Sequence, residues 1–104
     1  MAEPFFEIIT PEQAHKEMAD PQVVVLDLRD ETEYADGHIP SAVCLPLYRL
    51  EKDAQRLFPD RNQRILLYCL SGRRAMQGAR LLALDGYRRL AVFGGIQNWP
   101  FEIT

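Results

Sequence analysis

The sequence has little of what marks several protein classes. Its 104 residues include only two cysteines, Cys44 and Cys69, too few for the disulfide framework of a small secreted protein, so we expect both to be thiols. No apolar run approaches the roughly 18 residues of a membrane span. The first residues, MAEPFFEIIT, lack the basic and apolar regions of a signal peptide. These absences predict a soluble, cytoplasmic protein that makes no contact with membranes.

An excess of basic charge is also missing. Twelve Lys and Arg residues stand against fifteen Asp and Glu residues, which gives a formal charge of -3 and a pI near 5.3. Such a chain offers no broad positive surface for nucleic acid, so any attraction for anions must be local. The length and the 47% share of hydrophobic residues suit one hydrophobic core. We expect a single domain over residues 1–104, without repeats or linkers.

Apolar runs of strand length alternate with segments of helical spacing. The predicted strands are residues 5–10, 23–28, 42–47, 64–69 and 90–93. The predicted helices are residues 11–20, 31–37, 48–58 and 75–84. Capping boxes begin the first two helices, with Thr10 and Gln13 in one and Asp30 and Glu33 in the other, and Gly37 closes the second in a left-handed conformation. Strands that alternate with helices predict a parallel sheet wrapped by helices.

The stretch YCLSGRRA, residues 68–75, places a cysteine where a strand turns into a helix. In open α/β sheets, ligands bind beyond the carboxyl ends of the strands, and Cys69 stands at such an end. The first amides of the following helix have no partners within the helix, and they add to the positive end of the helix dipole. Such surroundings stabilise the thiolate, which is the nucleophilic form of cysteine. The pattern therefore predicts a nucleophilic Cys69.

The residues after Cys69 suit a tight anion-binding loop. Gly72 allows the chain to curl without a Cβ clash, and the Ser71 hydroxyl can donate a hydrogen bond. Arg73 and Arg74 supply local positive charge for an anionic substrate, preferably one whose oxygens match the guanidinium fork.

Three segments together resemble the single-domain rhodanese family, which is thiosulfate sulfurtransferase-like. They are VLDLRDETEYADGHIPSAVCLPL, LLYCLSGRRA and LALDGYRRLAVFGGIQNW, and the resemblance runs from Ile9 to Trp99. It implies a rhodanese-like three-layer α/β/α fold, with a five-stranded parallel sheet flanked by helices. It also implies that Cys69 accepts a sulfane sulfur and that the amides from Leu70 to Arg74 hold the resulting persulfide.

The resemblance implies transfer in two steps. Cys69 takes the outer sulfur of a small anionic donor such as thiosulfate, and a thiol, cyanide or protein acceptor then removes it, which is covalent catalysis with ping-pong kinetics. No metal or organic cofactor is expected. Arg73 and Arg74 would hold the sulfonate end of the donor, and Arg74, at the last position of the loop, is the better candidate. The predicted substrate-binding residues are Leu70, Ser71, Gly72, Arg73 and Arg74.

Two other functions stay open. Phosphatases and arsenate reductases of this fold place five residues between their cysteine and arginine, whereas only four separate Cys69 from Arg74, and the sixth position is Ala75. The smaller loop favours sulfur over a tetrahedral oxyanion. A regulatory or non-catalytic binding module could keep the fold without the chemistry, although the intact cysteine loop argues against it.

The remaining polar candidates are interpreted as structural. Cys44 is either a resolving thiol for the Cys69 persulfide or a buried apolar side chain, and we favour the second interpretation. His38 lies in a segment that shapes the fold, and attack by a preformed thiolate requires no base. Asp27 and Arg29 end a strand and are expected to form an ion-pair network that includes Glu33.

Overall fold

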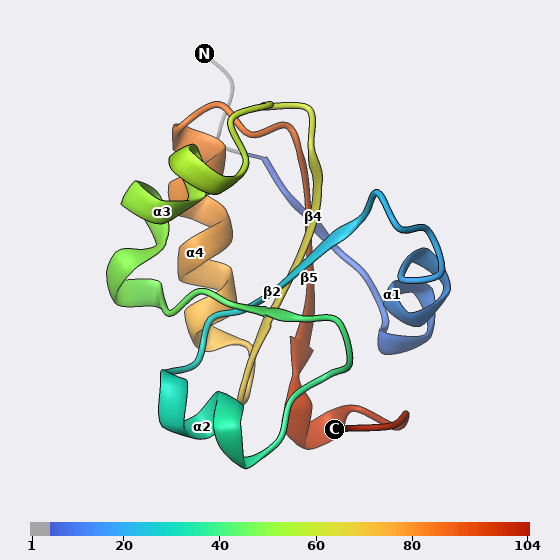
Figure 1. Cartoon of the computed structure of the whole chain (residues 1–104). Coiled ribbons are helices and arrows are strands. Elements are labelled where there is room, and N and C mark those ends of the chain that lie inside the picture. Colours follow the sequence, from blue (N-terminus) through green and yellow to red (C-terminus); the bar gives the residue numbers. More distant parts are fainter. Residues whose placement is uncertain (1–4) are drawn as a thin grey trace.

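A computed structural model describes residues 5–104 of the chain (Figure 1). Five strands form one parallel sheet in the spatial order β1-β5-β4-β2-β3. The strands are β1 (Glu7–Ile8), β2 (Val24–Asp27), β3 (Val43–Cys44), β4 (Arg64–Cys69) and β5 (Arg89–Gly95). The helices are α1 (Pro11–Glu17), α2 (Glu31–Asp36), α3 (Leu50–Leu57) and α4 (Arg73–Leu84), with 3₁₀ turns η1 (Leu47–Arg49) and η2 (Ile96–Asn98). The predicted α/β fold with a five-stranded parallel sheet is confirmed.

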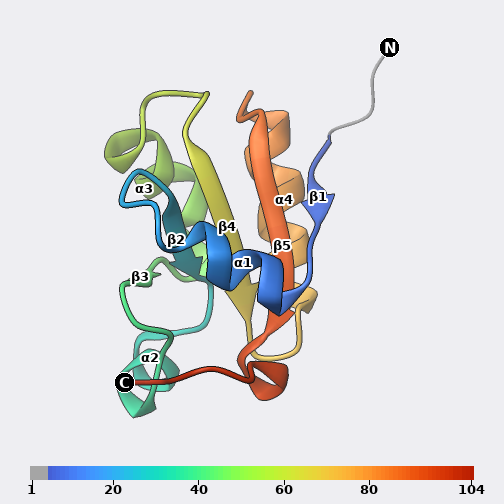
Figure 2. The same cartoon turned by 90° about the vertical axis from the view of Figure 1, so that its right-hand side faces the viewer.

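Helices cover both faces of the sheet. Figure 1 and Figure 2 show α3 and α4 on one face and α1 on the other. Successive residues of a strand point to opposite faces, so β4 gives Leu67 and Cys69 to the core under α4, and Leu66 and Tyr68 to the core under α1. The helix α2 lies beyond the carboxyl ends of the strands, at the bottom of Figure 1. That end is where parallel sheets carry their ligand sites.

Both predicted capping boxes are present. The Gln13 N–H donates to Thr10 Oγ1 over 3.0 Å, and the Thr10 N–H donates to Gln13 Oε1 over 2.8 Å. In α2, the Glu33 N–H donates to Asp30 Oδ1 over 2.9 Å, and the Asp30 N–H donates to Glu33 Oε1 over 3.1 Å. Gly37 ends α2 with a positive φ of +152°, but its ψ of 134° departs from the predicted left-handed helical conformation because the chain leaves α2 extended.

The strand β3 is shorter than the prediction of residues 42–47. Ladder pairing covers only Val43 and Cys44, because β2 ends at Asp27, the partner of Cys44. The Leu45 and Leu47 amides still donate to carbonyl oxygens at the end of β2, over 2.9 and 3.2 Å. The chain therefore stays beside β2 in extended form without being a regular strand.

Three helix boundaries differ from the predicted ones. The first helix ends at Glu17 rather than near Asp20, and the predicted helix at 48–58 is divided into η1 and α3. The helix α4 begins at Arg73 rather than at residue 75, because Gly72, at a φ of +110°, turns the chain directly into the helix. The earlier start brings the helix closer to Cys69 in the sequence.

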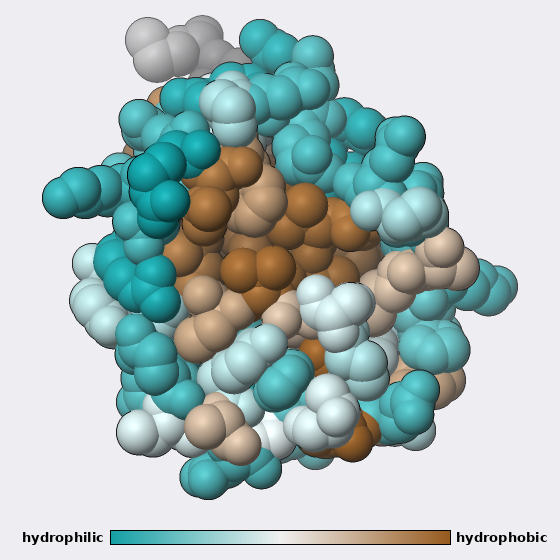
Figure 3. Space-filling model, viewed as in Figure 1, coloured by the Kyte–Doolittle hydropathy of each residue, from teal (hydrophilic) through white to brown (hydrophobic). Residues whose placement is uncertain are grey.

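One edge of the sheet carries a patch of apolar side chains. Figure 3 shows these side chains between the two helical layers, on the side of β2 and β3, with hydrophilic residues around them. Val43 is 39% exposed on this edge, and Val23 and Val24 are half-buried. The two-residue β3 covers only part of β2.

Across residues 5–104, no helix combines the length and the apolar character that crossing a membrane requires.

Candidate active site

Cys69 is the last residue of β4, at the carboxyl end of the sheet. Residues 70–72 connect it to α4. The cysteine is 1% exposed and belongs to the core cluster between the sheet and α4. The sulfur atom therefore lies below the surface, at the point where the strand, the loop and the helix meet.

Two backbone amides point at the Cys69 sulfur. The Gly72 N–H donates to Sγ over 3.0 Å and the Ala75 N–H over 3.4 Å; we call these two amides the sulfur cradle. No side chain caps the N-terminus of α4 at Gly72. The first helical hydrogen bond runs from the Met76 N–H to the Gly72 carbonyl. The Ala75 amide would otherwise have no partner. The cysteine sulfur thus caps the helix.

Of the predicted amides from Leu70 to Arg74, only that of Gly72 donates to Sγ, and the second donor is the Ala75 amide. Ala75 lies outside that range, but it is the third residue of α4, so its amide faces the sulfur. Leu70 is 44% exposed, and its carbonyl accepts the Gln97 N–H over 3.3 Å. Ser71 is exposed, and its hydroxyl makes no hydrogen bond within residues 5–104. The Leu70 and Ser71 side chains thus face the surface, whereas the Gly72 amide faces the sulfur.

The end of β5 forms the other wall of the site. Cys69 pairs with Gly95 in the sheet, and a Cβ on Gly95 would overlap the carbonyl group of Leu70. A Cβ on Gly72 would lie 3.4 Å from the Gly94 Cα. In the sequence, Gly94 and Gly95 stand out only as part of the segment LALDGYRRLAVFGGIQNW. In the structure they let two backbones touch.

The two arginines of the loop have different surroundings. Arg74 forms a bidentate ion pair with Glu33 of α2, with Nη1–Oε1 at 2.7 Å and Nη2–Oε2 at 3.1 Å. Hydrogen bonds from Arg74 hold the pKa of Glu33 below its ordinary value, and Glu33 raises the pKa of Arg74. Arg73 is exposed and has no hydrogen bond or ion pair with any residue between 5 and 104. Both arginines line one groove beside the loop.

A buried polar network lies beside the site without Glu33, contrary to the expectation. Arg29 donates to Asp27 through Nη2 over 2.7 Å, and Asp27 also accepts the Tyr68 hydroxyl over 2.6 Å. The Tyr68 oxygen in turn accepts the Ile39 N–H over 3.1 Å. Asp27 raises the pKa of Arg29, and burial raises that of Tyr68. Within residues 5–104, no buried side-chain nitrogen or oxygen lacks a hydrogen-bond partner. The network fixes the segment after α2 to the sheet, since Arg29 donates to the Gly37 carbonyl and Tyr68 accepts from Ile39.

Cys44 lies on the opposite face of the sheet from Cys69. Its partner in β2 is Asp27, which pairs with Tyr68 in β4, and Tyr68 faces the α1 side. Two strand spacings, about 10 Å, separate β3 from β4. Burial raises the pKa of the Cys44 thiol, and Asp27 adds to this shift. The placement agrees with the interpretation of Cys44 as a structural side chain.

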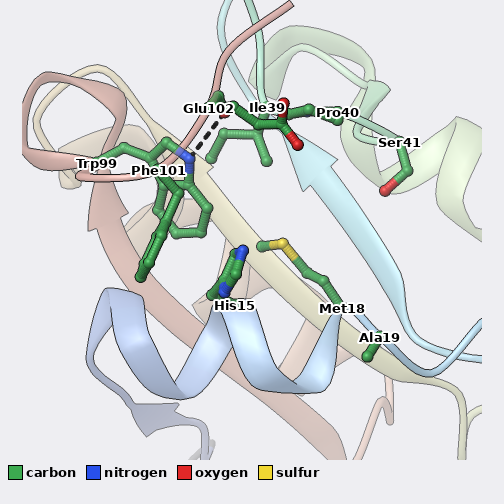
Figure 4. Close-up of a pocket in the computed structure, with 9 residues that line it drawn as sticks. All are labelled: His15, Met18, Ala19, Ile39, Pro40, Ser41, Trp99, Phe101 and Glu102. Carbon is green, nitrogen blue, oxygen red and sulfur yellow. Dashed lines mark hydrogen bonds between the residues drawn. The ribbon is translucent and has the colours of Figure 1, made fainter.

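His38 and an apolar cavity are also outside the Cys69 site. The His38 ring stacks on Tyr34 at 3.7 Å, and its Nδ1 lies 2.9 Å from the Tyr34 carbonyl oxygen. A cavity of about 280 Å³ opens on the α1 face, where the His15 and Phe101 rings stack beside Trp99 (Figure 4). No cysteine lines it. Among residues 5–104, no three His, Cys, Asp or Glu side chains gather in a way that could hold a metal ion.

Two proteins named as sulfurtransferases and one named as a putative sulfur carrier are similar in sequence. The chain is 35% identical over 82 residues to "Putative sulfur carrier protein YrkF" of Bacillus subtilis, covering 78% of this chain and 43% of that protein. It is 31% identical to thiosulfate:glutathione sulfurtransferase of Saccharomyces cerevisiae, with 76% and 65% covered. A sulfurtransferase of Allochromatium vinosum is 34% identical, with 88% and 85% covered. The chain thus spans less than two thirds of the first two relatives and most of the third.

Solved structures share the fold. The Alr3790 protein of Anabaena has a TM-score of 0.86 at 22% identity, covering 92% of this chain and 80% of that one. The human single-domain sulfurtransferase TSTD1 has a TM-score of 0.79 at 21% identity, covering 91% and 95%. The family model of the rhodanese-like domain matches residues 10–101, which include all of the elements that hold Cys69. The chain belongs to the rhodanese family.

Proposed function

We propose that this protein is a sulfurtransferase that carries a sulfane sulfur on Cys69 as a persulfide. The sulfurtransferase relatives support the general role. The observation that carries the assignment to Cys69 is the sulfur cradle, in which two amides at the start of α4 donate to Sγ. Amide dipoles and a helix N-terminus stabilise the thiolate before reaction and the persulfide anion after it. Residues 1–104 act as one domain in this proposal.

In the first step, the Cys69 thiolate attacks the outer sulfur of thiosulfate. A new S–S bond forms, the old S–S bond breaks, and sulfite leaves with the bonding electron pair. The charge is conserved, since a thiolate and a thiosulfate dianion become a persulfide anion and a sulfite dianion. No oxidant, metal or organic cofactor is needed. The sulfur cradle holds the charged atoms without having to reorganise during the step.

In the second step, an acceptor removes the outer sulfur. Cyanide attacks it, thiocyanate leaves, and the Cys69 thiolate is restored; a thiolate acceptor attacks the protonated persulfide in the same way and leaves as a persulfide itself. The donor departs before the acceptor enters, so ping-pong kinetics follow. Small thiols and protein thiols fit this step equally in chemical terms. Arg73 and Arg74 provide the positive charge beside the loop that favours an anionic donor.

Intact-protein mass spectrometry after incubation with thiosulfate tests the proposal. We expect the wild-type protein to gain one sulfur atom, which a reductant removes. The Cys69→Ser variant should gain none, and the Cys44→Ser variant should gain as much as the wild type. Absence of the gain with thiosulfate and with other sulfane donors would contradict the proposal. It would favour a binding module that keeps the fold without the chemistry.

A further inference from the structure

The two arginines of the Cys69 loop are adjacent in sequence but engaged differently. Both oxygens of Glu33 accept hydrogen bonds from Arg74. The Arg74 side chain is 34% exposed and the Glu33 side chain 29%. The guanidinium fork of Arg74 already holds a carboxylate in the planar, two-bond geometry that a sulfonate would use. A donor anion could use that fork only by displacing Glu33.

Glu33 has a second partner that makes this displacement harder. Its Oε1 also accepts the Asp30 N–H over 3.1 Å, which completes the capping box of α2. Moving the carboxylate would therefore break a helix cap together with a charged pair. The ionised form of Glu33 is already the favoured one, since the Arg74 hydrogen bonds hold its pKa below the ordinary value. The structure thus keeps Arg74 bound to α2.

Arg73 is free of such partners. It is the first residue of α4, it is exposed, and it lines the groove of about 630 Å³ with Ser71 and Gln77. No carboxylate among residues 5–104 pairs with it. Its charge is thus not cancelled by a neighbour, and its fork can receive an anion without breaking an existing bond.

We propose that Arg73 is the residue that contacts the anionic sulfur donor, and that the Arg74–Glu33 pair is a positioning clamp for the sulfur cradle. This inference rests on the proposed sulfurtransferase function and assigns its donor site. The clamp joins α2 to the second residue of α4, one position before the Ala75 amide that contacts Sγ. The sequence favoured Arg74 for donor binding. Because Arg74 is paired with Glu33, that role passes to Arg73.

Steady-state kinetics with thiosulfate separates the two roles. Arg73→Gln should raise the KM for thiosulfate about tenfold, the usual effect of losing one hydrogen bond to a charged group, with a small change in kcat. Glu33→Gln and Arg74→Gln should each lower kcat about tenfold through a displaced cradle, with KM changed by less than about twofold. The double variant with both Glu33→Gln and Arg74→Gln should have the same kcat and KM as either single variant, because either substitution alone already breaks the pair.

Alkylation of Cys69 gives a measurement that does not depend on sulfur transfer. In a Cys44→Ser background, the ratio of the rates with anionic iodoacetate and neutral iodoacetamide reports local positive charge and cancels changes in loop geometry. Arg73→Gln should lower this ratio about threefold or more, given the strength of a single nearby charge at the surface. Arg80→Gln, an exposed arginine farther along α4, is the matched control and should leave the ratio unchanged.

The opposite assignment gives opposite results. If Arg74 binds the donor, Glu33→Gln frees its fork and lowers the KM for thiosulfate, and Arg73→Gln changes neither KM nor the alkylation ratio. Either result would overturn the inference. A wild-type protein that forms no persulfide would instead overturn the proposed function, and the alkylation ratio would still decide which arginine faces an anion near Cys69.

Discussion

At the scale of single residues, the alternation of side chains along strands separates the two thiols. Cys69 faces α4 and accepts hydrogen bonds from two backbone amides, whereas Cys44 pairs with Asp27 on the α1 side. Burial raises the pKa of the Cys44 thiol, so its reactive thiolate is scarce at neutral pH. Position in the sheet thus gives two chemically identical side chains different surroundings.

We expect Cys44→Ser to leave sulfur uptake and turnover within about twofold of the wild type, because Cys44 lies two strands away from Cys69 and on the opposite face of the sheet. The unmodified Cys44 thiol should also react more slowly with a disulfide reagent than a small free thiol at the same pH. Stopped-flow thiol titration of the Cys69→Ser variant measures this rate. A rate equal to that of the free thiol would show that Cys44 is not shielded.

Residue types at the site could be predicted, but their partners could not. The sequence indicates Cys69, Gly72 and the arginines from local spacing. Glu33 is 41 positions away from Arg74, and its visible local role is to cap α2. No periodicity links it to the loop, so its pairing depends on where the sheet brings α2. The expected grouping of Glu33 with Asp27 and Arg29 was wrong, because Glu33 binds Arg74 instead.

At the scale of elements, the contact between the Cys69 loop and the end of β5 sets the width of the site. The two backbones touch because Gly95 has no Cβ, and Gly94 allows the turn with a φ of +94°. The two glycines differ in what surrounds them. A Cβ on Gly95 meets the Leu70 carbonyl group, whereas a Cβ on Gly94 meets nothing within 4 Å.

Gly95→Ala should therefore abolish or strongly reduce sulfur uptake, since the loop has to move away from β5 and the sulfur cradle moves with it. Gly94→Ala is the matched control. It should cost about 1–2 kcal/mol in the free energy of unfolding, from the unfavourable φ alone, and should retain uptake. Urea unfolding and persulfide mass spectrometry measure the two effects. Equal uptake by both variants would mean that the contact does not position the loop.

Local signals predicted where the two capped helices, α1 and α2, begin. The capping boxes at Thr10 and Asp30 were readable because the partners are three residues apart. The length of β3 was not, because an apolar run such as 42–47 does not reveal whether a neighbouring strand continues beside it. The start of α4 was set by the turn at Gly72 rather than by the first alanine of the apolar face.

At the scale of the whole molecule, ion pairs connect segments that are distant in the sequence. Arg64 of β4 binds Glu17 of α1 through Nε and Nη2, over 2.8 and 2.7 Å, and Glu7 of β1 through Nη1, over 2.9 Å. These bonds lie at the opposite end of β4 from Cys69. Hydrogen bonding by Arg64 holds the pKa of Glu17 below its ordinary value.

A carboxylate with a lowered pKa in the folded state stabilises the protein above its unfolded pKa, and this stabilisation is lost as the pH falls through the folded value. We expect the free energy of unfolding to be nearly constant from pH 7 to 5 and to fall below about pH 4. Glu17→Gln should lose at most about 1 kcal/mol at pH 7 and show a shallower acid decline. Urea unfolding across this range, with Glu12→Gln on the exposed side of α1 as control, measures both. An acid decline as steep as that of the wild type would exclude a contribution from this pair.

The class of the fold was predictable as a whole, but its strand order was not derivable from the residues. Alternating strand and helix patterns predict a parallel sheet because parallel neighbours need crossovers. The order β1-β5-β4-β2-β3 depends on which side each crossover takes, and apolar periodicity does not record that choice. The resemblance of the three motif segments implied a five-stranded parallel sheet, which the structure has, but it implied no strand order.

The sulfur that caps α4 has a consequence for which residues position 69 can hold. Backbone amides donate to an oxygen as readily as to a sulfur, so an oxygen-bearing residue at position 69 can complete the same helix start. Folding therefore restricts the residue type at position 69 less than the proposed sulfur chemistry does. Under the proposed function, one substitution at position 69 would therefore end sulfur transfer and leave the fold in place.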